Sequence, residues 1–163
     1  LYLFSAEPIY QDGPMRYVVR QDSAERFQEI TTIGALLDCP MRLGVVAAYS
    51  YGEWVDRNIA AHDPPREIVT VGDDQGNFFR MLAGGRVDYL FAGTEETVWN
   101  LRNNPEYQKK LVTRDLEDAP AGNVRWLMFS KGTPAALLDR INVAIVAVKA
   151  GDKYRQIVAS AKR

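Results

Sequence analysis

The sequence has 163 residues, of which 47% are hydrophobic and 25% charged. This composition is typical of an ordinary globular domain and does not favour a disordered chain. The formal net charge is −1 and the basic residues are scattered, so the chain offers no footprint for nucleic acid or an anionic membrane surface. No apolar run approaches the ~20 residues of a membrane span, and Cys39, the only cysteine, excludes an internal disulfide.

Strands and helices alternate along the chain, and this order predicts an α/β fold. The apolar run 43–47 has the composition of a strand buried on both faces, and 87–92 is also a buried strand. We therefore expect a mostly parallel sheet with helices on both faces. The predicted strands are 15–20, 43–47, 68–71, 87–92, 111–113 and 124–130. The predicted helices are 32–38, 50–61, 74–83 and 94–103, followed by two terminal helices separated by Gly151.

The sequence offers no constellation of residues for catalysis. A single histidine, His62, and a single cysteine provide neither a zinc cage nor a Cys–His nucleophile pair. Neither a phosphate-binding GxxxxGK[ST] run nor a dinucleotide-binding GxGxxG run is present. Adjacent carboxylates fall near helix starts or in loops, where they complement the helix dipole. We therefore expect no catalytic residue, metal or cofactor.

Two strand-to-helix junctions carry residues suited to a ligand site. Ligands of open α/β sheets collect beyond the carboxyl ends of strands, where helix N-termini present unpaired N–H groups. The first junction, residues 47–52, offers hydroxyl, backbone and aromatic groups. The second, residues 92–95, has two small residues followed by a threonine with its hydroxyl group. The predicted ligand-binding residues are Tyr49, Ser50, Tyr51, Gly93 and Thr94.

Both junctions also have a purely structural interpretation. Ser50 and Glu53 have the spacing of a capping box, in which two side chains satisfy the free N–H groups at a helix start. Thr94 precedes acidic residues and suits an N-cap position. Sequence physics alone favours the capping interpretation over the binding interpretation at each junction.

The order of several segments resembles the family 3 extracellular solute-binding proteins, which are polar amino-acid receptors of ABC importers. The similarity depends on collinearity over nearly the whole chain, since no single motif is highly specific. The matching segments are Phe4–Tyr10 with the strand 15–20 (FS-x-P-Y and the first hinge strand), Thr32–Leu37 (sl-x-dL), Arg42–Val46 with Tyr49–Gly52 (vgv-x-x-G-[ST]), Met81–Tyr89 (L-x-x-GrvDa) and Phe129–Gly132 (f-x-kg).

The resemblance implies a periplasmic-binding-protein type 2 fold that lacks the N-terminal half of its first lobe. Residues 1–21 would form a remnant of lobe 1 and the first hinge strand, 22–122 lobe 2, and 123–163 the second hinge strand and the C-terminal helices of lobe 1. The strands 15–20 and 124–130 would then be neighbours in the hinge. The apolar stripe of the first terminal helix would be partly exposed or covered by another chain; it comprises Leu137, Leu138, Ile141, Ile145 and Val148.

The resemblance also implies a function. The chain would bind a small polar solute, an amino acid or an organic acid, in a two-lobed cleft, as the periplasmic or extracellular receptor of an ABC importer. Its partners would be that solute and a membrane permease, with no nucleic acid, and its precursor would carry a signal peptide. Gly93 stands where amino-acid receptors carry an aspartate, which favours organic acids or uncharged solutes.

Two alternatives use the same fold. The chain could be the extracytoplasmic sensor domain of a membrane signalling protein. It could also be an accessory module of a cell-wall lytic enzyme, which would require a separate catalytic domain.

Overall fold

The computed structural model describes residues 2–62, 68–71 and 75–162 of the chain. It divides into two compact units, which are described separately below. Unit 1 consists of Leu1–Gly13 and Ala121–Arg163, and unit 2 consists of Pro14–Pro120.

Unit 2 is built on a five-stranded sheet with the order β5-β4-β6-β3-β7. β4 pairs in parallel with both β5 and β6, whereas β3 pairs antiparallel with both β6 and β7, so the sheet is mixed. The predicted parallel arrangement of the strands near 43–47, 68–71 and 87–92 is confirmed. The strands are β3 (Met15–Arg20), β4 (Leu43–Val46), β5 (Ile68–Val71), β6 (Tyr89–Gly93) and β7 (Leu111–Asp115).

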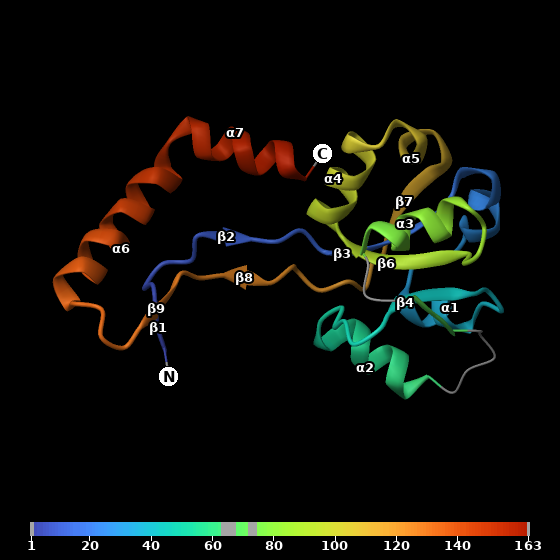
Figure 1. Cartoon of the computed structure of the whole chain (residues 1–163), viewed down its shortest axis with the longest axis horizontal. Helices are drawn as coiled ribbons and strands as arrows, with labels where there is room; N and C mark the ends of the chain where they lie inside the picture. Colours follow the sequence, from blue (N-terminus) through green and yellow to red (C-terminus); the bar gives the residue numbers. More distant parts are fainter. Residues whose placement is uncertain (1, 63–67, 72–74, 163) are drawn as a thin grey trace. The chain divides into compact units, whose positions relative to one another are not determined.

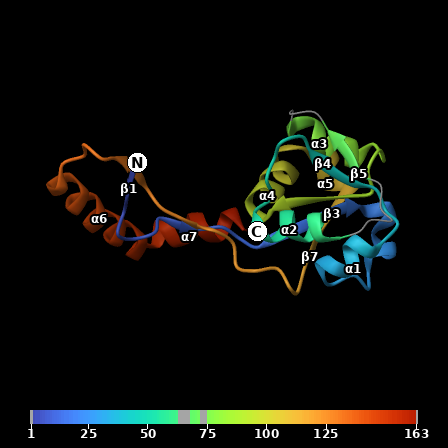
Figure 2. The same cartoon turned by 90° about the horizontal axis from the view of Figure 1, so that it is seen from below.

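Helices cover both faces of this sheet, as predicted. The 3₁₀ helix η1 (Gln21–Phe27) follows β3 directly. In two perpendicular views α1 and α2 lie on one side of the sheet, and α3, α4 and α5 lie on the other (Figures 1 and 2). The helices are α1 (Ile33–Asp38), α2 (Glu53–Ala61), α3 (Gln75–Ala83), α4 (Thr94–Asn103) and α5 (Pro105–Lys110). Asp74, the predicted start of the third helix, lies outside the described residues.

The helix α5 is absent from the predicted elements, although the sequence carries its start signal. The Asn104 side chain accepts hydrogen bonds from the backbone N–H groups of Glu106 and Tyr107, at 3.1 and 3.4 Å. Pro105 then occupies the first helical position, where its missing N–H costs nothing. An Asn-Pro pair after a helix therefore indicates a second helix start.

A chain of buried aromatic rings runs through the core of unit 2. Neighbouring ring centroids lie 6.0–6.5 Å apart, at tilted or edge-on angles that suit aromatic packing. In order of contact these rings are Tyr17, Phe27, Tyr89, Phe91 and Tyr51. The core therefore extends continuously to the loop that follows β4.

The prediction that the strand 15–20 pairs with 124–130 in a hinge is wrong. β3 lies inside the sheet of unit 2, and its central residues Tyr17, Val18 and Val19 have no exposed surface. Three consecutive buried residues need cover on both faces, which an interior strand receives and a crossing segment does not. Within the segment 124–130, the strand β8 (Val124–Arg125) pairs instead with β2 (Tyr10–Gln11), in antiparallel orientation.

Unit 1 contains two short antiparallel strand pairs and the two terminal helices. β1 (Tyr2–Phe4) pairs with β9 (Met128–Ser130), and β2 pairs with β8. The helices are α6 (Ala135–Ala150) and α7 (Asp152–Ala161). Hydrogen bonds from Lys149 to the Pro8 carbonyl, at 2.7 Å, and from Tyr154 to the Ile9 carbonyl, at 2.6 Å, fasten these helices to the N-terminal segment.

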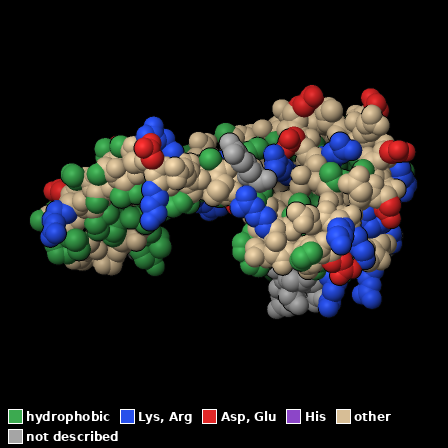
Figure 3. Space-filling model, turned by 90° about the horizontal axis from the view of Figure 1, so that it is seen from above, with side chains coloured by type: hydrophobic (Ala, Val, Ile, Leu, Met, Phe, Trp, Pro, Cys, Tyr) green, Lys and Arg blue, Asp and Glu red, His purple; other side chains and the backbone are tan. Residues whose placement is uncertain are grey.

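The predicted partial exposure of the α6 stripe is confirmed for the described chain. Leu137 and Val148 are 44% and 61% exposed, whereas Ile145 is buried. Apolar side chains gather on the surface of the part that carries α6 (Figure 3). Within unit 1 they line an open hollow of about 280 Å³, bounded by Ile9, Leu127, Ile141, Ala144, Ile145, Val148, Lys149 and Tyr154. None of the helices in the described ranges is both long and apolar enough to cross a membrane.

Candidate functional site

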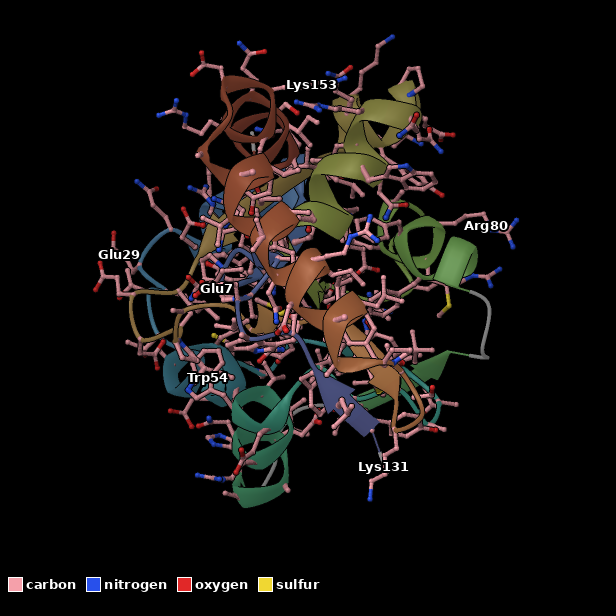
Figure 4. The ribbon with its side chains drawn as sticks, turned by 90° about the vertical axis from the view of Figure 1, so that its left-hand side faces the viewer. Glu7, Glu29, Trp54, Arg80, Lys131 and Lys153 are labelled. Carbon is pink, nitrogen blue, oxygen red and sulfur yellow. The ribbon has the colours of Figure 1, made fainter. Side chains whose placement is uncertain are left out.

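The two predicted junctions lie at the same edge of the sheet in unit 2. β4 and β6 are parallel neighbours, so the segments that leave their carboxyl ends begin side by side. α2 follows β4 after the loop 47–52, and α4 follows β6 directly. On α2, Trp54 is partly buried beside α1 (Figure 4) and Val55 is fully buried, and these two side chains fix the helix against the core. We call Tyr49, Ser50, Tyr51, Gly93 and Thr94 the strand-end site.

Tyr51 joins the two junctions. Its ring is only 8% exposed and packs against Phe91 of β6 and Phe78 of α3, with centroid distances of 6.5 and 6.3 Å. Its hydroxyl accepts a hydrogen bond of 2.8 Å from the backbone N–H of Val46, the last residue of β4. Burial raises the pKa of Tyr51 to about 12, against the opposing effect of this hydrogen bond, so the phenol is neutral. Tyr51 therefore supports the site from the interior.

Tyr49 provides the accessible aromatic surface of the site. Its side chain is 44% exposed and meets the Tyr51 ring nearly edge-on, with centroids 5.0 Å apart and an angle of 71° between the rings. The buried Tyr51 ring thus holds an exposed ring at the edge of the sheet. Such a surface suits a flat or apolar part of a ligand, or a cation over the ring face.

The hydroxyl of Ser50 is engaged in a compact hydrogen-bonded loop. It donates to one carboxylate oxygen of Asp56 at 2.5 Å and accepts from the backbone N–H of Gly52 at 3.2 Å. The backbone N–H of Tyr51 donates to the other Asp56 oxygen at 3.0 Å. α2 begins only at Glu53, with Gly52 as its N-cap, so the predicted Ser50–Glu53 capping box is wrong.

At the second junction Thr94 is the first residue of α4, and Gly93 takes the N-cap position predicted for Thr94. Thr94 is 2% exposed, and its hydroxyl donates to the Pro14 carbonyl at 2.8 Å. The hydroxyl of Thr97 donates to the Gly93 carbonyl at the same distance. A Cβ atom at Gly93 would meet no atom within 4 Å, so open space adjoins this backbone. At this junction the accessible group is Gly93.

Glu96 is a half-buried acidic residue at the same edge that the sequence predictions do not include. Burial raises the pKa of its carboxyl group, while a hydrogen bond from the Gly93 N–H opposes this effect. Its charge also acts on Tyr51, which places it near the first junction. The signal in the sequence is its position three residues after the helix N-cap, where a carboxylate reaches back to the backbone. The described residues contain no cluster of three or more potential metal ligands.

Ala48 occupies an unusual backbone conformation beside the site. Its φ of 55° lies in the left-handed region, which costs a residue with a Cβ about 1–2 kcal/mol. We predict that Ala48→Gly raises the free energy of unfolding by about 0.5–1 kcal/mol, because relief of this strain exceeds the entropy that glycine adds to the unfolded chain. Urea unfolding of the purified variant measures the change.

Ala47→Gly is the matched control. Ala47 is adjacent and also exposed, but its φ is not positive. This substitution adds only unfolded-state entropy and is expected to destabilise the protein by about 0.5–1 kcal/mol. Changes of the same sign in the free energy of unfolding of both variants would contradict strain at Ala48.

No protein-family model and no curated protein sequence matches the chain. Solved structures do match it. An ancestral cationic amino-acid solute-binding protein has a TM-score of 0.71 and 17% identity, over 99% of this chain and 62% of that protein. A probable amino-acid ABC transporter extracellular-binding protein from Bacillus subtilis has a TM-score of 0.71 and 16% identity, over 95% and 61%. A Salmonella typhimurium periplasmic binding protein with high arginine specificity has a TM-score of 0.61 and 20% identity, over 99% and 65%.

At 16–20% identity this likeness shows the fold alone. The predicted α/β fold of the periplasmic-binding-protein type 2 class is confirmed. The chain spans about three fifths of the length of these neighbours, at 61–65%.

Proposed function

We propose that this chain is the solute-binding part of a receptor for an ABC importer, and that it binds a small polar solute at the strand-end site. Unit 2 would be one lobe of the receptor, and unit 1 would belong to the other. The receptor would act in the periplasm or outside the cell and deliver its solute to a membrane permease. It would need no catalytic residue and no cofactor.

One observation carries this proposal. The parallel strands β4 and β6 bring two helix-start segments to the same sheet edge, and Tyr51 packs across both, so that Tyr49 and Gly93 lie at one edge with accessible surface. Carboxyl ends of adjacent parallel strands are where open α/β sheets bind ligands. Structural neighbours bind amino acids, among them arginine, glutamine and lysine.

Titration calorimetry on the full-length protein tests the proposal. The ligand panel contains arginine, lysine, glutamine, acetate and succinate. We expect one member of this panel to bind, and Tyr49→Ala to weaken its affinity about tenfold, because the substitution removes the exposed ring that would contact the solute.

Trp99→Ala is the control for a general effect of losing an exposed aromatic side chain. Trp99 is highly exposed and lies farther along α4, away from the helix start. Its replacement should leave the affinity unchanged. Absence of binding by every member of the panel, or equal affinities for wild type and Tyr49→Ala, would count against the proposed function.

A further inference from the structure

The hydrogen-bond donors at the first junction are already bound to a carboxylate of the protein itself. Asp56 lies in the first turn of α2, and each of its carboxylate oxygens receives one donor from the preceding loop. The donors are the Ser50 hydroxyl, at 2.5 Å, and the Tyr51 backbone N–H, at 3.0 Å. This is the bidentate arrangement that would otherwise receive the carboxylate of a solute.

Both backbone groups of Gly52 also take part in this hydrogen-bonded loop. The Gly52 N–H donates to the Ser50 oxygen, and the Gly52 carbonyl accepts from the Asp56 N–H at 3.0 Å. Ser50 therefore has its hydroxyl hydrogen and one acceptor position in use, and Asp56 closes the loop through both its backbone and its side chain. A solute carboxylate could reach these donors only by displacing Asp56.

The charges around the loop also disfavour an anion. The carboxylate of Glu53 is paired with Arg57 one turn along α2. Among the residues that the structure describes, no cationic side chain forms an ion pair with Asp56 or Glu96, and Glu96 lies half-buried at the neighbouring helix start. An anionic group entering at Tyr49 would face these two carboxylates, whereas a cation or a neutral dipole would not be repelled.

We propose that Asp56 is a specificity-determining residue of the strand-end site: it holds the loop donors as an internal anion, so the solute group that meets Tyr49 is neutral or cationic and not a carboxylate. The inference rests on the proposed function for its solute, but the behaviour of Asp56 can be measured without any solute. A neutral or cationic solute group at Tyr49 is the opposite of the preference for organic acids that Gly93 alone suggests.

Chemical rescue tests the internal anion directly. We expect Asp56→Ala to lower the Tm of the full chain by roughly 3–6 °C, because the substitution removes both hydrogen bonds to this partly exposed carboxylate. Sodium acetate should restore much of this loss by occupying the vacated position, relative to sodium chloride at the same ionic strength. Wild type should show no acetate-specific increase, since Asp56 already fills the position.

Two variants keep this test decisive. Asp56→Asn fills the same volume and retains an acceptor, so acetate should not raise its Tm. The double variant Ser50→Ala/Asp56→Ala lacks one donor and should lose most of the rescue. Failure of acetate to act on Asp56→Ala, or an equal increase for wild type, would overturn the proposal whether or not a solute binds.

The calorimetric panel tests the consequence for specificity. Asp56→Ala should gain affinity for acetate or succinate at least tenfold over wild type and should not gain affinity for arginine or lysine. If wild type binds an organic acid and Ser50→Ala weakens that binding, the loop recognises a solute carboxylate and the inference is wrong, although the proposed function stands. If no panel member binds wild type while acetate rescues Asp56→Ala, the proposed function fails and the internal anion remains.

Discussion

Replacement of Tyr51 by alanine is expected to lower the free energy of unfolding by about 3–5 kcal/mol. The ring is buried between Phe78 and Phe91, so its removal leaves a cavity at the end of the aromatic core. It also leaves the Val46 N–H, which now donates to the tyrosine hydroxyl, without its partner. Urea unfolding followed by circular dichroism measures the loss, and the Tyr49 ring should lose its fixed position together with the Tyr51 ring.

Tyr51→Phe separates the hydroxyl from the ring. This variant keeps the packing and removes only the acceptor for Val46, so we expect a loss of about 1–2 kcal/mol. The pKa of Tyr51 is raised to about 12 in the folded protein. The neutral phenol therefore contributes its full stabilisation below the unfolded pKa, near 10, and this contribution is lost as the pH rises from there toward 12. The difference between wild type and Tyr51→Phe should therefore narrow above pH 10. A difference that stays constant with pH would contradict burial of this phenol.

Asp88→Asn is expected to destabilise the protein by about 2–3 kcal/mol. The carboxylate of Asp88 accepts hydrogen bonds from the Arg42 backbone N–H at 2.9 Å and from its Nε and Nη2 atoms, both at 3.1 Å. Arg42 Nη2 also donates to the Gly85 carbonyl at 2.8 Å. The pair thus connects the start of β4 with the turn before β6, and it sets the relative position of the two strands whose far ends form the site.

This effect should depend on pH in a defined direction. Burial acts to raise the pKa of Asp88, but the hydrogen bonds and positive charge of Arg42 outweigh it and hold the pKa below its ordinary value. A depressed folded pKa gives stability that is present above the unfolded pKa, near 4, and lost as the pH falls through the folded value. The difference between wild type and Asp88→Asn should be complete at neutral pH and shrink below pH 4.

Asp22→Asn provides the matched control. Asp22 pairs with Arg20 at 3.0 Å but is largely exposed, so its loss should cost less than about 1 kcal/mol. Equal losses for Asp88→Asn and Asp22→Asn would show that the Arg42–Asp88 pair does not connect the two strands as described.

The sequence by itself determines the order of elements in unit 2. Apolar runs and helical stripes are local patterns, and they predict β4, β5, β6 and the helices α1 to α4 to within a few residues, except at the start of α2. They also predict that β4 and β6 are parallel and deliver two helix starts to one edge of the sheet. Collinear resemblance to solute-binding proteins predicts the fold, which the structural neighbours confirm.

Pairing between distant strands is decided only in three dimensions. The run Tyr17-Val18-Val19 predicts a strand, but nothing local to it distinguishes a hinge segment from the interior position between β6 and β7. That choice depends on which neighbours supply hydrogen bonds and cover both faces, and these lie up to about a hundred residues away in the sequence. For the same reason β2 and β8, which have two residues each, were not predicted as a pair.

The roles of the five predicted site residues also depend on tertiary structure. Their composition indicates hydroxyls and aromatic rings at one edge, and the structure places them there. It assigns Tyr51 and Thr94 to the interior, leaves Tyr49 accessible, and binds Ser50 to Asp56. A donor is available to a ligand only where no acceptor of the protein already binds it. Asp56 lies five or six residues from its donors, and it can accept from them only when the loop and the first turn of α2 are folded against each other. The sequence determines which groups are present at the edge, and the folded loop decides which of them remain for a solute.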